Sequence, residues 1–250
     1  MTNAPEGWLS DFAADGSGAN AKTGIVLVHG FTGSPAGMRP WAHFLNDRGY
    51  TVRLPRLPGH GTKWQDLNEV TWQEWPDRVS KDVEELLTKC ERVFIFALSM
   101  GGATSIQVAH RYGPKIAGLV FVNPMITIKG PAQYFLPILS KFVPKMKAVG
   151  GDIKRPGASE WSYNALPLKG VVQLRKLLKD SRAKLPEIKH PFMIFHSVDD
   201  HVLPVYNTEI YMAEIGSTNK QRIELINSYH VATVDYDADI IFENSLQMLR

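Results

Sequence analysis

The stretch VFIFALSMGG at residues 93–102 indicates the fold and the chemistry of this chain more clearly than any other segment. Its apolar run, 93–96, predicts a buried strand, and a helical segment is expected from Met100 onward. Between them, residues 97–101 (ALSMG) fit the small–x–Ser–x–Gly pattern of a sharp strand-to-helix turn that exposes a strained hydroxyl on Ser99. The first position is usually Gly, so Ala97 makes the pattern less selective. The alternative is a serine that only caps a helix.

Short apolar runs and amphipathic segments alternate along the chain. Runs too short for helices predict further buried strands at 25–28, 51–54, 119–122, 192–195 and 223–226. Apolar residues at helical spacing predict helices at 38–48, 71–90, 100–112 and 242–249, the second with Thr71 and Glu74 as a capping box. This alternation predicts an α/β fold with a mostly parallel sheet and helices on both faces.

Residues 125–190 interrupt the alternation. This interval is rich in apolar residues and prolines, and nothing in it resembles a buried sheet strand. We therefore expect a core whose first part is 1–124, an inserted helical cap at 125–190, and a second part of the core at 191–250. The alternative is that the interval forms ordinary surface helices packed on the core.

Composition and missing motifs exclude several classes of function. The formal net charge of +3, without a Lys/Arg block or a nucleic-acid motif, argues against a nucleic-acid partner. We expect no metal and no organic cofactor, because HExxH, Cys/His and dinucleotide-binding glycine motifs are missing. Cys90 is the single cysteine, so no intramolecular disulfide can form. The first 18 residues lack a signal-peptide pattern, which predicts a cytoplasmic location.

A serine hydroxyl becomes a good nucleophile only when a base takes its proton. The strand–Ser–helix pattern occurs with the chain order Ser, then Asp or Glu, then His. His230, in the loop NSYHV at 227–231, is the one histidine that follows the last predicted strand. The acid is expected in the loop SVDDHVLP at 197–204. Of its two aspartates we favour Asp200, and Asp199 remains the alternative.

The segment HGFTG at 29–33, directly after the first predicted strand, suggests an oxyanion hole. Such a site needs two preorganised N–H donors where negative charge develops. In this class of motif one donor is the residue after the nucleophile, Met100, and the other lies in the early loop, best placed at Phe31. The alternative is a plain glycine turn. We expect His29 to support this loop and His60 to stabilise the turn in which it lies.

These strings together resemble the bacterial monoacylglycerol lipases and their carboxylesterase relatives within the α/β-hydrolases. The resemblance runs from about Gly24 to the C-terminus. It is carried by HGFTGSP at 29–35, MRP at 38–40, RLPGHGT at 56–62, LSMGG at 98–102, DHVLP at 200–204 and NSYHVAT at 227–233.

The resemblance implies an α/β-hydrolase fold with Ser99 as nucleophile, Asp200 and His230 completing a catalytic triad, and the Phe31 and Met100 amides as oxyanion hole. It also implies a small cap over an apolar acyl tunnel and a polar pocket for glycerol.

By the same resemblance Glu160 is a candidate to contact the alcohol, and the alternative is an exposed cap carboxylate. The implied reaction releases a fatty acid and glycerol from a monoacylglycerol. A general short- to medium-chain carboxylesterase shares every catalytic residue, while an acyltransferase or thioesterase needs another acceptor or donor. A non-catalytic binding protein predicts a damaged triad, which the sequence does not show. The apolar cap also suggests transient contact with lipid aggregates or a membrane surface.

Overall fold

A seven-stranded sheet forms the centre of the molecule in the computed structural model, which describes residues 4–148 and 151–250. The strand order is β1-β3-β2-β4-β5-β8-β9. Every neighbouring pair is parallel except β1 with β3. The strands are β1 (Phe12–Ala14), β2 (Thr23–Val28), β3 (Thr51–Leu54), β4 (Arg92–Leu98), β5 (Ile116–Val122), β8 (Phe192–Ser197) and β9 (Lys220–Leu225).

The predicted mostly parallel sheet is confirmed, and each predicted apolar run lies in one of its strands, except that Ile226 follows the end of β9. The edge strand β1 was not predicted, because three residues are too few to show an alternating pattern. It pairs with β3 from Phe12 opposite Leu54 to Ala14 opposite Val52.

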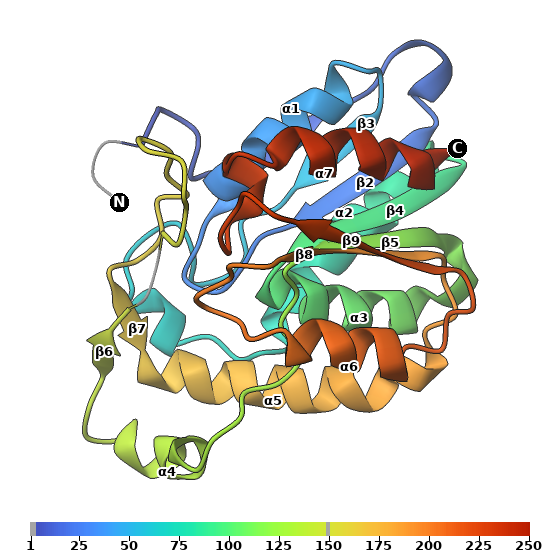
Figure 1. Cartoon of the computed structure of the whole chain (residues 1–250). Coiled ribbons are helices and arrows are strands. Elements are labelled where there is room, and N and C mark those ends of the chain that lie inside the picture. Colours follow the sequence, from blue (N-terminus) through green and yellow to red (C-terminus); the bar gives the residue numbers. More distant parts are fainter. Residues whose placement is uncertain (1–3, 149–150) are drawn as a thin grey trace.

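Helices cover both faces of the sheet (Figure 1). Successive side chains of a strand point to opposite faces, so Ile25 and Leu27 belong to one buried cluster and Val26 and Val28 to the other. The first face is covered by α1 (Arg39–Asn46) and α7 (Ala238–Ser245). The second is covered by α2 (Glu74–Lys89), α3 (Met100–Tyr112), α5 (Leu168–Lys184) and α6 (Tyr206–Glu214).

The starts of two helices differ from the predicted ones by three or four residues. The helix α2 begins at Glu74 rather than Thr71. Only half of the expected capping box forms, since the main-chain N–H of Thr71 donates to the Glu74 carboxylate at 2.7 Å. The helix α7 begins at Ala238, four residues before the predicted start at Phe242, and a 3-10 turn over Leu246–Leu249 follows it.

The interval 125–190 holds two differently packed parts. The helix α4 (Ala132–Leu139) and the antiparallel ribbon of β6 (Lys145–Lys147) and β7 (Ala165–Pro167) stand apart from the central sheet (Figure 1). The helix α5 instead buries Leu174 and Leu177 in the cluster on the α3 face. Within the described ranges, the central sheet takes no strand from this interval. None of the described helices is long and apolar enough to cross a membrane.

Candidate active site

Ser99 lies at the sharp turn between β4, which ends at Leu98, and α3, which begins at Met100. Its backbone has φ 55° and ψ −122°, a conformation that costs a residue with a side chain about 1–3 kcal/mol. The turn brings α3 so close to β2 that a Cβ on Gly101 would lie 2.2 Å from the Val28 carbonyl oxygen. The glycine therefore permits the packing that holds the strained serine at the carboxyl end of the sheet.

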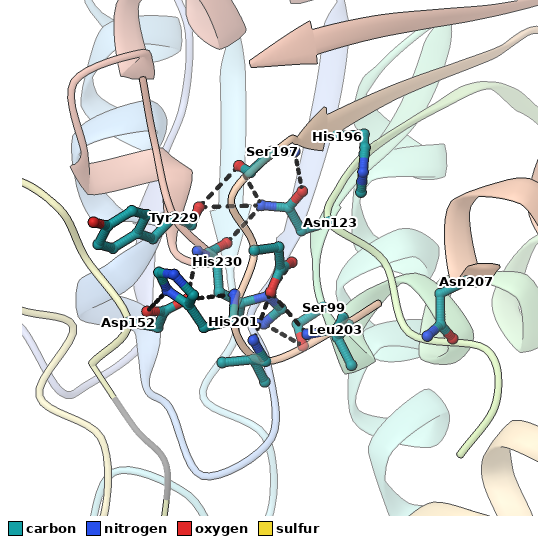
Figure 2. Close-up of polar contacts among 12 residues, drawn as sticks. Ser99, Asn123, Asp152, His196, Ser197, His201, Leu203, Asn207, Tyr229 and His230 are labelled. Carbon is teal, nitrogen blue, oxygen red and sulfur yellow. Dashed lines mark hydrogen bonds and ion pairs between the residues drawn. The ribbon is translucent and has the colours of Figure 1, made fainter. Parts of the chain in front are cut away.

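His230 connects Ser99 to Asp200 (Figure 2). Its Nε2 lies 3.0 Å from the Ser99 Oγ, and its Nδ1 lies 2.8 Å from an Asp200 oxygen. The second Asp200 oxygen accepts the main-chain N–H groups of Val202 at 2.8 Å and Leu203 at 2.7 Å. The His230 and Asp200 side chains are only 8% and 2% exposed. Because the carboxylate can only accept, Nδ1 carries the proton and Nε2 accepts from the serine hydroxyl.

The other candidate residues of the acid loop lie outside this chain of hydrogen bonds. Asp199 is exposed to solvent, whereas Asp200 faces the histidine. The exposed ring of His201 donates from Nδ1 to Asp152 at 2.9 Å. The structure thus brings Asp200 rather than Asp199 to His230.

Opposing effects set the charges of the buried pair. Burial disfavours the imidazolium, but the nearby Asp200 charge and its hydrogen bond more than offset this and raise the pKa of His230. Burial likewise opposes ionisation of Asp200, yet the attraction to His230 and the hydrogen bonds hold the pKa of that carboxyl below its usual value. A raised pKa makes His230 a stronger base, available in its neutral form above that pKa.

Both predicted oxyanion donors belong to backbone that borders Ser99. A Cβ on Gly30 would lie only 3.1 Å from the Ser99 Cβ, so the loop at 29–33 passes directly against the serine. Phe31, in that loop, lines the same cavity as Ser99. The Met100 N–H is at the first position of α3, where an amide has no partner within the helix.

Two buried histidines, His29 and His60, support the loop at 29–33. The Leu57 N–H donates to Nε2 of His29 at 3.1 Å, and the His29 Nδ1 lies 2.9 Å from the Gly30 carbonyl oxygen. The His60 ring packs 5.1 Å from the His29 ring, centroid to centroid. Burial lowers the pKa of His29 to about 4 and that of His60 to about 3. Both are therefore neutral structural groups at neutral pH.

A cavity of about 330 Å³ opens at Ser99 and His230. Its lining includes the carboxylate residues Asp152 and Glu160, and Glu160 accepts the Gly151 N–H at 3.2 Å. Burial raises the pKa of Glu160. The remaining wall is largely aliphatic and comes from α4, β6, β7 and α5, with Leu136, Met146, Leu166, Leu168, Val171 and Leu174.

Asn123, which the sequence interpretation missed, joins three elements of the site. Its amide oxygen accepts the Ser197 N–H at 2.7 Å, and its amide nitrogen donates to the Ser197 hydroxyl at 2.9 Å and to the His230 carbonyl at 2.8 Å (Figure 2). Asn123 thereby ties the ends of β5 and β8 to the loop of the base. The available signal was its position, a polar residue directly after the predicted strand 119–122.

A serine at a strained strand-to-helix turn of a mostly parallel sheet, followed in the chain by its aspartate and histidine, defines a serine hydrolase of the α/β-hydrolase class. The chain belongs to the family described as serine aminopeptidase, S33, whose model matches residues 19–237.

Three relatives illustrate the similarity. The thermostable monoacylglycerol lipase of Bacillus sp. (strain H-257) is 39% identical over 91% of this chain and 90% of its own length. The carboxylesterase of Bacillus subtilis (strain 168) is 26% identical over 90% of this chain and 91% of its own. A solved structure of the metagenome-derived lipolytic enzymes LipS and LipT superposes with a TM-score of 0.92, at 34% identity, covering 97% of this chain and 98% of that one.

Proposed function

We propose that this protein is a carboxylic ester hydrolase that releases a fatty acid and glycerol from monoacylglycerols. The observation that carries the proposal is the hydrogen-bonded chain Ser99–His230–Asp200, whose serine and histidine line a mostly aliphatic cavity. Identity of 39% to a monoacylglycerol lipase over most of both chains supports this substrate class over a general carboxylesterase.

The proposed reaction proceeds through an acyl-enzyme. The Nε2 of His230 takes the Ser99 proton as Oγ attacks the ester carbonyl carbon, and the N–H groups of Phe31 and Met100 hold the oxyanion. The imidazolium then protonates the leaving glycerol oxygen as the ester C–O bond breaks. A water molecule, deprotonated by His230, then attacks the acyl carbon. The bond from that carbon to the Ser99 Oγ breaks, the imidazolium returns its proton to Oγ, and the fatty acid is released.

Within the interval 125–190, the part before α5 is proposed as the cap that selects the substrate, because α5 itself packs on the core. Its α4 and β6–β7 ribbon supply Leu136, Met146 and Leu166 to the aliphatic wall, where an acyl chain would lie. We propose that Glu160, which lines the cavity, accepts a hydrogen bond from a free glycerol hydroxyl. A single cavity of about 330 Å³ suits one acyl chain rather than the three chains of a triacylglycerol.

A hydrolysis profile across acylglycerols and simple esters tests the proposed substrate. We expect kcat/KM for a monoacylglycerol to exceed that for the di- and triacylglycerol, and for the methyl ester of the same acid, at least about tenfold. Glu160→Gln should reduce the ratio of kcat/KM for the monoacylglycerol to kcat/KM for the methyl ester, because the methyl ester lacks glycerol hydroxyls. Equal kcat/KM for the two substrates would instead favour the general carboxylesterase.

The exposed side of the cap is proposed to touch the surface of lipid aggregates. Tyr134, Phe135, Ile138, Phe142 and Met146 are between 51% and 80% exposed. The sequence from 124 to 148 carries four lysines and no acidic residue. Apolar side chains flanked by lysines suit an anionic lipid surface. Met146 also lines the cavity, so this contact would bring the wall of the cavity to the lipid.

Phe142→Asp is expected to weaken co-sedimentation with anionic phospholipid vesicles about tenfold or more, because it removes a large apolar side chain from the contact. Hydrolysis of a water-soluble short-chain ester should be retained. Ile226→Asp is a matched control, because Ile226 is 76% exposed but follows β9, outside the cap. Equal effects of the two substitutions on sedimentation would refute contact through the cap.

A further inference from the structure

Asp152 lies between β6 and β7, and its carboxylate contacts both loops of the triad (Figure 2). One oxygen accepts the main-chain N–H of His230 at 3.1 Å and that of His201 at 3.1 Å. The other oxygen faces Nδ1 of His201 at 2.9 Å. The Asp152 carbonyl oxygen also accepts the Val231 N–H at 3.1 Å. With its side chain 12% exposed, Asp152 is a well-enclosed link rather than a surface carboxylate.

The geometry of the base depends on two separate loops. Asp200 is in the loop after β8 and His230 in the loop after β9, and their 2.8 Å bond requires the two loops to keep a fixed separation. On one side, Ser197 holds the loops together by donating its hydroxyl hydrogen to the Tyr229 carbonyl at 2.9 Å. Asp152 supplies a second link, between the residue that follows Asp200 and the base itself.

Asp152 also contributes negative charge to the surroundings of His230. The carboxylates that face the histidine are Asp200, Glu160 and Asp152, and each favours the imidazolium, against the opposing effect of burial. Asp152 faces His201 in turn, and its hydrogen bond and charge raise the pKa of that histidine, as do the charges of Asp199 and Asp200. Removing Asp152 would therefore loosen the two loops and weaken the stabilisation of the protonated base.

We propose that Asp152 is a positioning residue for the proposed reaction: its carboxylate fixes the main chain at His230 and His201 and so holds the base in line with its acid and with Ser99. This inference rests on the proposed function. Because Asp152 lies between β6 and β7, within the interval 125–190, it also couples the position of this interval to the triad.

Two substitutions separate the roles of the carboxylate in purified enzyme assayed on one soluble ester. Asp152→Ala removes both main-chain contacts, and we expect kcat to fall about 10- to 100-fold with KM little changed. Asp152→Asn keeps an oxygen that can accept the two N–H groups but loses the charge, so most of kcat should be retained. In both variants the His230 pKa should fall, and the acid limb of kcat/KM against pH should move about one unit lower.

Asp199→Asn is the matched control, because it removes an exposed carboxylate that neighbours Asp200. It should leave kcat and the acid limb unchanged, since solvent screens an exposed charge. An Asp152→Ala variant with wild-type kcat and acid limb would overturn the proposal. A second outcome would also overturn it. In that outcome the kcat of Asp152→Ala falls only as far as its folded fraction, measured by thermal unfolding, and the acid limb of Asp152→Asn stays at the wild-type pH. A wild-type protein without esterase activity would defeat the proposed function instead, which keeps the two failures distinguishable.

Discussion

Ser99→Ala is expected to lower kcat for ester hydrolysis by roughly 10⁶, because no other group can accept the acyl chain once the hydroxyl is gone. The change should leave the fold intact. Alanine can adopt the backbone conformation of Ser99 at a similar cost. The change removes the hydrogen bond between the hydroxyl and His230, which is a contact of the site rather than of the core. Steady-state turnover of a soluble ester, with thermal unfolding as a check of folding, measures both effects.

Ser105→Ala is the control for this substitution. Ser105 is also buried in α3, but its hydroxyl donates to the Gly101 carbonyl oxygen within the helix. Its loss should leave turnover close to that of the wild type. If Ser99→Ala kept a kcat close to that of Ser105→Ala, Ser99 could not be the nucleophile.

Asp200→Asn should lower kcat by about 10⁴, whereas Asp199→Asn should leave it nearly unchanged. The Asp200 carboxylate fixes the proton on Nδ1 of His230 and stabilises the imidazolium, and an amide can do neither reliably. Asp199 is exposed and is not the partner of the base. Parallel kcat measurements of the two variants decide between the neighbouring aspartates. A larger loss at Asp199 would reverse the assignment of the acid.

The pattern of apolar runs predicted the sheet well because buried parallel strands need apolar residues on both sides. The runs at 25–28 and 93–96 show this, since both of their faces are covered by helices in the structure. The three-residue edge strand β1 carries no such pattern and depends on its pairing with β3. Pairing along an edge is a tertiary contact, and a single sequence does not record it.

The same distinction holds within the site. Ser99 and His230 were predictable because their local strings and chain order follow a recurring motif. The sequence placed two adjacent aspartates in the acid loop, and only the direction of each side chain separates Asp200 from Asp199.

Asn123 and Asp152 could not be predicted as parts of the site. Asn123 hydrogen bonds to a residue 107 positions later, and Asp152 to one 78 positions later. Neither residue belongs to a motif. Each acts through main-chain groups that are brought together only when the loops after β5, β8 and β9 meet at one edge of the sheet.

Covalent trapping of the nucleophile tests the central claim most directly. An organophosphonate ester with a nitrophenolate leaving group forms a stable phosphorus–oxygen bond to an activated serine as nitrophenolate departs. Peptide mass spectrometry of the inactivated protein should find one phosphonyl group per chain, on Ser99, and the Ser99→Ala variant should remain unlabelled. Complete inactivation with the label on another residue, or on none, would contradict the acyl-enzyme on Ser99.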